Sequence, residues 1–207
     1  MALDLDKEYY AQGYRYIVGT DEAGRGCLLG PVFAAAVIWP KDLESPLIND
    51  SKKLTAKKRE EAYDFIIKNA IAYGIAYVDA DEIDEVNIYN ASRIAMQKAI
   101  ANMNHEFDLV ITDAMKMPNY DKPVVDVIHG DALSMSIAAA SILAKVSRDR
   151  LCDELDKKYP AYNIKKNKGY GTKDHLEALK KFGPVKHLHR FTYAPVKACF
   201  IEKVSLF

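Results

Sequence analysis

The chain has 207 residues, a length that suits one domain with an appended lobe better than two separate domains. Its composition, 49% hydrophobic and 28% charged, is that of an ordinary globular protein with a sizeable core. No apolar run approaches the roughly 18 residues that span a bilayer, and the charged N-terminus does not resemble a secretory signal, so we expect no membrane association. Three scattered cysteines without metal-binding spacing favour a reducing, cytoplasmic setting.

A net charge of zero hides an uneven distribution of charge. Residues 157–190 contain ten lysines and arginines against two acidic residues, so this segment carries +8 and the remainder carries −8. A basic lobe beside an acidic body is expected of an enzyme that binds nucleic acid next to carboxylate-bound metal. Composition alone favours the simpler interpretation, which is a solvated surface rich in lysine.

The hydrophobic pattern predicts strands and helices along the whole chain. In chain order we expect strands at 14–20 and 32–39, a helix at 55–68, a strand at 70–78, a helix at 84–104, strands at 108–112 and 124–128, and helices at 132–159 and 173–181. Thr55 is predicted to cap the first of these helices, and Phe182-Gly183-Pro184 to end the last.

This order of elements predicts an α/β domain with a mixed five-stranded sheet flanked by helices. Three early strands joined by short connections indicate an antiparallel meander, and later strands separated by helices indicate parallel additions. We therefore expect residues 1–207 to form a single domain, in which residues from about 160 to 207 make a C-terminal helical lobe.

Four carboxylates stand where strand ends meet in such a sheet. Asp21 and Glu22 follow the first predicted strand, Asp113 follows the fourth, and Asp131 precedes the long helix. Adjacent residues of a strand point to opposite faces, so Asp21 and Glu22 can share a site only if the backbone turns there, and the glycines of Gly24-Arg25-Gly26 would allow that.

Carboxylates gathered at one rim repel one another, and a divalent cation removes that cost. Ligation by oxygen alone favours Mg²⁺ or Mn²⁺ over zinc. Each acid also has an ordinary interpretation, because Asp131 by itself suits a helix N-cap and Asp113 could cap a turn. The combination of four acids, rather than any one of them, predicts the metal site.

Five stretches of the sequence closely resemble the motifs of type 2 ribonucleases H, the ribonuclease HII family. They span nearly the whole chain in the family's order: residues 19–26 with 30–32, 49–55, 130–131 with 138–149, 168–172 with His175, and 189–196. The resemblance implies a ribonuclease H-like fold and cleavage of RNA within RNA–DNA hybrids. It also implies cutting on the 5′ side of single ribonucleotides embedded in duplex DNA, as in ribonucleotide repair and RNA primer removal.

By position, the resemblance implies that Asp21, Glu22, Asp113 and Asp131 hold two Mg²⁺ or Mn²⁺ ions for hydrolysis to 3′-OH and 5′-phosphate ends. It implies that Gly24-Arg25-Gly26 reads the ribose 2′-hydroxyl through its backbone. Recognition of that hydroxyl is what separates RNA from DNA at a single nucleotide.

The resemblance also implies that Tyr170 stacks on the sugar at the RNA–DNA junction. Lys52 and Lys145 are candidates for phosphate contacts, although a solvated or ion-paired lysine is an equally good interpretation of each. This sequence departs from the family pattern at His129, where a lysine is usual, and at Ala114, where a glycine-containing turn is common, which makes Asp113 the least secure of the four acids.

The rival interpretations are another ribonuclease H-like nuclease, such as a transposase or junction resolvase, and a hybrid-binding protein without turnover. The four acids and the tyrosine loop argue against both. We expect the chain to act as a monomer. The C-terminal Val204–Phe207 tail resembles peptides that dock on bacterial sliding clamps, although packing of a terminal element is the simpler interpretation of it.

Overall fold

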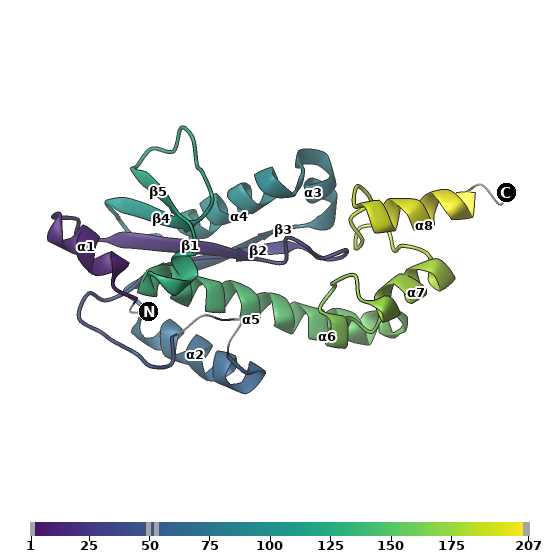
Figure 1. Cartoon of the computed structure of the whole chain (residues 1–207), viewed down its shortest axis with the longest axis horizontal. Helices are drawn as coiled ribbons and strands as arrows, with labels where there is room; N and C mark the ends of the chain where they lie inside the picture. The colour runs from purple at the N-terminus through teal and green to yellow at the C-terminus, as the bar shows by residue number, and fades with distance from the viewer. Residues whose placement is uncertain (1–2, 49–50, 52–53, 205–207) are drawn as a thin grey trace.

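The structure, a computed structural model, describes residues 3–48, 51 and 54–204. Figure 1 shows a sheet with helices on both faces and a group of short helices beyond one end of it. The strands are β1 (Ile17–Ala23), β2 (Val32–Ile38), β3 (Ala72–Val78), β4 (Leu109–Asp113) and β5 (Val124–Val127). The helices are α1 (Leu5–Ala11), α2 (Ala56–Asn69), α3 (Ala80–Val86), α4 (Ile88–Asn102), α5 (Met135–Lys158), α6 (Ile164–Asn167), α7 (Lys173–Phe182) and α8 (Ala194–Val204), with 3₁₀ turns at Gly130–Ala132 and Pro160–Tyr162.

The five strands form one mixed sheet in the order β3-β2-β1-β4-β5. β1, β2 and β3 pair antiparallel, as predicted, although only the connection between β1 and β2 is short and α2 lies between β2 and β3. β4 and β5 add in parallel to the other side of β1, as predicted. α3 and α4 precede β4, whereas β5 follows β4 through a loop without a helix. The predicted α/β class and the mixed five-stranded sheet are confirmed.

Two hydrophobic layers hold this sheet between helices. α4 packs on one face with residues such as Val18 and Ala34, and α5 and α2 pack on the other with residues such as Ala35. Gly19 lets α5 lie directly against β1, because a Cβ at that position would overlap the backbone of Ser136 and Ile137. This close contact places the middle of α5 beside the end of β1.

A separate hydrophobic cluster builds the C-terminal lobe. Leu28 and Leu29, which follow β1, pack with residues of α5, α7 and α8. Figure 1 shows α7 and α8 beyond the ends of β1 and β2, while α5 runs along the sheet towards them. The lobe is therefore joined to the sheet by the chain that leaves β1. No helix in the described part of the chain is long and apolar enough to cross a membrane.

Three predicted boundaries are wrong. β1 ends at Ala23 rather than at residue 20, so Asp21 and Glu22 lie inside a strand and the backbone does not turn between them. The predicted helix at 84–104 is two helices, separated at Asn87, which adopts a left-handed φ of 67°. α5 begins at Met135 and its N-cap is Ser134, so Asp131 precedes the helix instead of capping it. The Thr55 cap of α2 is confirmed, since its side chain accepts a hydrogen bond from the Lys58 amide.

Candidate active site

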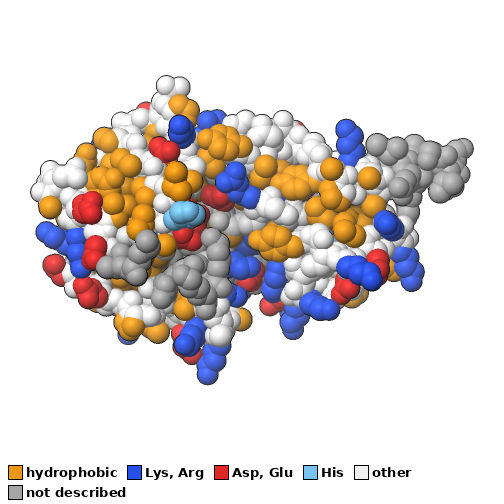
Figure 2. All heavy atoms as spheres, in the orientation of Figure 1, with side chains coloured by type: hydrophobic (Ala, Val, Ile, Leu, Met, Phe, Trp, Pro, Cys, Tyr) orange, Lys and Arg blue, Asp and Glu red, His pale blue; other side chains and the backbone are white. Residues whose placement is uncertain are grey.

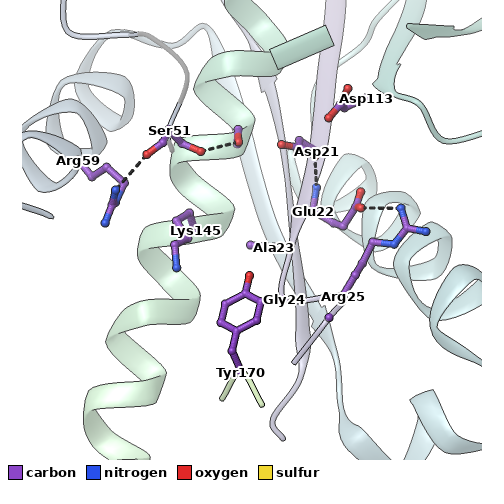
Figure 3. A pocket seen from close by; sticks show the side chains of 12 residues that line it. Asp21, Glu22, Ala23, Gly24, Arg25, Ser51, Arg59, Asp113, Lys145 and Tyr170 are labelled. Carbon is purple, nitrogen blue, oxygen red and sulfur yellow. Dashed lines mark hydrogen bonds and ion pairs between the residues drawn. The ribbon is translucent and has the colours of Figure 1, made fainter. Parts of the chain in front are cut away.

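A cleft of about 460 Å³ opens where β1 leaves the sheet beside α5. It gathers side chains from five distant parts of the sequence, and Figure 3 shows them facing one another across it. The lining residues are Asp21, Glu22, Ala23, Gly24, Arg25, Gly26, Ser51, Arg59, Asp113, Ser141, Lys145 and Tyr170. Nine of the ten residues singled out from the sequence for the site are described; eight of these are in that set, and Asp131 is not.

Asp21 lies on the α5 face of β1, where its carboxylate accepts hydrogen bonds from the Glu22 amide at 2.7 Å and from Ser141. Burial raises the pKa of this carboxyl well above its usual range, and the neighbouring carboxylates of Glu22 and Asp113 raise it further. The side chain is 6% exposed. The fold therefore holds an acid where its negative charge is costly.

Glu22 lies on the opposite face of the strand and reaches the same rim of the sheet. One carboxylate oxygen pairs with the Arg25 guanidinium at 3.1 Å, while the other is buried and has no hydrogen-bond partner among the described residues. Burial raises the pKa of the Glu22 carboxyl, and the Arg25 charge opposes that rise. A buried carboxylate oxygen without a donor is a position at which a cation would lower the free energy.

Asp113 ends β4 on the same face of the sheet as Asp21. The parallel register pairs Thr20 with Thr112, so these two acids are the next residues of adjacent strands. The Gly130 amide donates to the Asp113 carboxylate at 2.9 Å, which ties the turn carrying Asp131 to the end of β4. Asp131 is buried in that 3₁₀ turn and does not line the cleft.

Within the described residues, no three acidic, histidine or cysteine side chains converge closely enough to form a complete metal site by themselves. The donor set nevertheless fits a hard divalent cation, because Mg²⁺ sites commonly use one or two carboxylates together with water and substrate phosphate oxygens. Asp21, Glu22 and Asp113 supply such carboxylates, and one buried oxygen of Glu22 has no hydrogen-bond partner among the described residues. The site is thus suited to bind a cation together with a phosphate.

The opposite wall of the cleft is cationic and polar. Lys145 of α5 lines it while pairing with Asp149 at 2.6 Å, so the ion-paired interpretation of this lysine and its place in the cleft both hold. The Ser51 hydroxyl lies 3.0 Å from that of Ser141, and Arg59 donates to the Ser51 carbonyl at 3.0 Å. Lys52, also predicted to contact substrate, lies outside the described residues.

The turn at residues 24–26 is braced from behind by two buried arginines. Gly24 has a φ of 100°, and a Cβ there would overlap the Arg148 side chain. Arg190 donates to the Arg25 carbonyl at 2.9 Å, and the Tyr193 hydroxyl donates to the same oxygen at 2.6 Å. The backbone of this turn therefore has one defined course past the cleft.

Tyr170 lies on a second loop, and its half-exposed ring faces the cleft (Figure 3). The backbone of this loop pairs with the segment that follows β1: Tyr170 forms a β-bridge with Cys27, and the Leu28 amide donates to the Gly169 carbonyl at 2.8 Å. Arg148 donates to the Lys168 carbonyl at 2.7 Å. The same buried arginine thus supports both loops that border the cleft.

No role was predicted from the sequence for Ser51, Arg59 and Ser141 in the cleft, or for Arg148 and Arg190 behind it. Four of these residues stand within or beside the motifs that carry the family resemblance, which was the available signal. Arg59 carried no signal, since it is one of several basic residues in α2. Figure 2 shows several Lys and Arg side chains, with a few acidic ones among them, over the region of α6 and α7.

Two buried histidines beneath the Tyr170 loop predict a pH dependence of stability. Burial lowers the pKa of His189 to about 4, whereas in the unfolded chain it is about 6.5. The unfolded chain therefore takes up a proton that the folded ring refuses, so this contribution to stability is complete above pH 6.5 and is lost as the pH falls towards 4.

We expect that the difference in free energy of unfolding between the wild type and His189→Gln shrinks by roughly 2 kcal/mol between pH 7 and pH 4. Denaturant titrations at several pH values measure it. The raised pKa of Asp21 is present in both proteins and cancels in the difference. A difference that stays constant across this range would show that His189 is not held neutral.

Comparison with known proteins assigns the family. The ribonuclease HII family model matches residues 18–196. The ribonuclease HII of Caldanaerobacter subterraneus subsp. tengcongensis is 53% identical over 188 residues, which cover 91% of this chain and 78% of that protein. These matches include both loops of the cleft and all four candidate acids.

Solved structures agree with the sequence relatives. The ribonuclease H2 of Pyrococcus horikoshii OT3 superposes with a TM-score of 0.78 at 25% identity and covers 91% of this chain and 98% of that one. The RNase HII in a PCNA complex from Archaeoglobus fulgidus superposes with a TM-score of 0.71 at 25% identity, covering 84% and 92%. The family depends on divalent metal ions. The chain therefore belongs to the ribonuclease HII family and is a ribonuclease H endonuclease, EC 3.1.26.4, acting on RNA–DNA hybrids.

Proposed function

We propose that this endonuclease also cuts duplex DNA on the 5′ side of a single embedded ribonucleotide and leaves 3′-OH and 5′-phosphate ends. One observation carries the proposal: the carboxylates, the Gly24–Gly26 turn and the Tyr170 ring border a single cleft. A reader of one ribose must stand next to the group that hydrolyses the adjacent phosphate. Ribonucleotide excision repair and removal of RNA primers are the processes that such an activity would serve.

Asp21, Glu22, Asp113 and Asp131 are proposed to hold two divalent ions. The support is the cost of burying the Asp21 and Glu22 carboxylates beside one another and Asp113, together with the Gly130 amide that links the Asp131 turn to Asp113. Bound Mg²⁺ or Mn²⁺ would supply an activated water and charge stabilisation of the leaving oxygen.

The ribose is proposed to lie between the Gly24–Gly26 backbone and the Tyr170 ring. Gly26 has room for a close approach, since the atom nearest to a Cβ there is Cε1 of Tyr170 at 3.8 Å. A fixed backbone can donate to or accept from a 2′-hydroxyl, and a deoxyribose offers no partner in return. The buried arginines behind the turn give it the rigidity that such discrimination needs.

Phosphates on either side of the ribose are proposed to contact Lys145, Lys52 and the basic lobe. Neutralising several phosphates releases counterions, so we expect the affinity for a hybrid duplex to fall at least tenfold between about 50 and 200 mM salt. Fluorescence anisotropy in EDTA, in which no cutting is expected, measures it. An affinity independent of salt would remove the basic lobe from the interface.

The whole chain is proposed to act as one catalytic domain, because the lobe cluster includes Leu28 and Leu29 from the chain leaving β1. We propose a monomer in a reducing cytoplasm, where the three free and buried cysteines need no oxidant.

The C-terminal tail is a proposed site for a sliding clamp. The Archaeoglobus fulgidus RNase HII was solved in complex with PCNA, and this chain ends in Leu206 and Phe207, which lie outside the described residues. Deleting residues 204–207 should abolish binding to the clamp and leave cleavage intact. Binding that survives the deletion would place the contact elsewhere.

Two substrates test the proposal, a long RNA–DNA hybrid and a DNA duplex carrying one ribonucleotide, each incubated with Mg²⁺, with Mn²⁺ or with EDTA. We expect both to be cut with either metal, no cutting in EDTA, and a single incision 5′ of the ribonucleotide. Cutting of the long hybrid alone would restrict the function to hybrids.

A further inference from the structure

The loop that carries Tyr170 rests on a pair of histidines that no part of the proposed chemistry uses. His175, in the first turn of α7, and His189 are both fully buried. Their Nε2 atoms lie 3.3 Å apart, and the Tyr162 ring packs 5.0 Å from His189 between ring centroids. The two facing nitrogens can form a hydrogen bond only if one of them carries a proton and the other does not.

The outer contacts of the pair determine where each proton lies. The Val185 amide donates to Nδ1 of His189 at 2.9 Å, so this nitrogen accepts and the proton of a neutral ring must be on Nε2. Nδ1 of His175 lies 2.9 Å from the Tyr170 carbonyl, which can only accept, so this nitrogen carries the proton. Nε2 of His175 is then the acceptor that the Nε2–H of His189 requires.

The contacts therefore form one directed chain, from the Val185 amide through His189 and His175 to the Tyr170 carbonyl. A second proton on either ring would break a link. Burial lowers the pKa of both imidazoles, which keeps the chain intact at neutral pH.

Two residues in this series of hydrogen bonds are also paired with the extended segment that follows β1. His189 bridges to Leu29, and Tyr170 bridges to Cys27. The hydrogen bonds through His175 and His189 connect these two bridged points directly, so they fix the distance between the Tyr170 loop and the 24–26 turn. The adjacent residue, Arg190, contacts that turn through the Arg25 carbonyl.

We propose that His175 and His189 are positioning residues that fix the backbone of Tyr170, and thereby the place where its ring meets the ribose. The contact of that ring with ribose is part of the proposed function, and the positioning of the ring is not. These hydrogen bonds predict that, for cleavage activity, the N–H that His175 donates to the Tyr170 carbonyl is more important than the bulk of the imidazole ring.

Two substitutions separate the links. His175→Asn places an amide near the position of Nδ1 and keeps a donor for the Tyr170 carbonyl while losing contact with His189. His175→Gln places an amide near the position of Nε2 and keeps a partner for His189 while losing the donor to Tyr170. Both replace a buried ring by a polar side chain, so each is the packing control for the other, and thermal unfolding reports whether they fold.

We expect His175→Gln to lower kcat/KM on the single-ribonucleotide duplex on the order of fivefold to tenfold, the value of one hydrogen bond. His175→Asn should keep most of the activity. In a Tyr170→Ala background the two variants should cleave equally, because the ring they position is gone. The proposal would be overturned if His175→Gln lowered kcat/KM as much in the Tyr170→Ala protein as in the protein that keeps Tyr170. It would also be overturned if His175→Asn were as poor as His175→Gln.

A measurement without cleavage makes the two failures distinguishable. Imidazole ¹⁵N spectra at pH 7 should show His175 protonated on Nδ1 and His189 on Nε2, and the Tyr170 ring signals should move in His175→Gln but not in His175→Asn. The opposite tautomers, or unmoved Tyr170 signals, would refute the positioning. A wild-type protein with the expected spectra that leaves the single ribonucleotide uncut would refute the proposed function alone.

Discussion

Asp21→Asn should lower Mg²⁺-dependent cleavage of a single-ribonucleotide duplex by at least about a thousandfold, because a neutral amide is a poor ligand for a hard cation. The same substitution should make the metal-free protein more stable. Asn keeps the oxygen that accepts from the Glu22 amide, so the local structure has no reason to change. Cleavage rates and thermal unfolding in EDTA measure the two effects.

The expected gain in stability follows from the direction of the pKa shift. Burial, Glu22 and Asp113 raise the pKa of Asp21 above its unfolded value, so the folded state favours the protonated acid. That contribution is present below the unfolded pKa and is lost as the pH rises through the folded pKa. At pH 7 the wild type bears this cost and the variant does not, so the midpoint of unfolding should rise by roughly 2–4 °C or more.

Asp126→Asn is the matched control, since Asp126 is an exposed acid on β5 of the same sheet. It should change neither cleavage nor the unfolding midpoint measurably. Wild-type cleavage by Asp21→Asn would contradict the assignment of this residue to the metal site. A lower unfolding midpoint would contradict the claim that the buried Asp21 charge destabilises the metal-free protein.

Gly24→Ala should destabilise the protein by roughly 2–5 kcal/mol and lower cleavage at least tenfold. The φ of 100° strains any side chain, and the new methyl would overlap Nε of the buried Arg148, which is held by the Lys168 and Leu29 carbonyls. Displacing Arg148 should disturb the turn and the Tyr170 loop together. Denaturant unfolding and single-turnover cleavage measure both consequences.

Two other glycines separate strain from overlap. Gly13 has the same φ of 100° but no described heavy atom within 4 Å of an added Cβ, so Gly13→Ala should show the backbone strain alone, about 1 kcal/mol. Gly26 needs no left-handed backbone and has its nearest contact at 3.8 Å, so Gly26→Ala should retain the fold. If Gly24→Ala were no more destabilising than Gly13→Ala, the packing of Arg148 under the turn would be refuted.

The sheet could be predicted from the sequence because its strands follow local patterns. The short connection between β1 and β2 predicted an antiparallel pair, and the helical pattern before β4 predicted its parallel addition to β1. Neither rule accounts for β3, which follows α2, or for β5, which follows β4 without a helix. The end of β1 could not be predicted, since Asp21 and Glu22 before glycines resemble a turn. Pairing with Ala34 and Ala35 of β2 extends the strand regardless, which is a tertiary interaction overriding local propensity.

The break between α3 and α4 could not be predicted from the sequence either. The apolar spacing continues through Asn87, and only its left-handed backbone and its hydrogen bond from the Asn90 amide reveal a new helix N-terminus. Asn tolerates that conformation better than most residues, but a single Asn is too weak a signal to split a helix.

The candidate acids were found because strand ends and motifs lie in the sequence itself. The supports of the site were not, because they are contacts between residues more than a hundred positions apart. Arg190 reaches the Arg25 carbonyl and Arg148 reaches the Leu29 carbonyl, and a buried arginine bonded to backbone leaves no pattern of its own. The tautomers of His175 and His189 likewise depend on the partners that folding brings to them.

One measurement tests the central claim most directly. Two DNA duplexes identical in sequence, one with a single ribonucleotide and the other with the matching deoxyribonucleotide, are incubated with the wild-type protein and Mg²⁺, and the product ends are mapped. We predict one incision 5′ of the ribonucleotide with 3′-OH and 5′-phosphate ends, and no incision of the all-DNA duplex. Equal cleavage of both duplexes would contradict reading of the 2′-hydroxyl beside the carboxylates of Asp21 and Glu22.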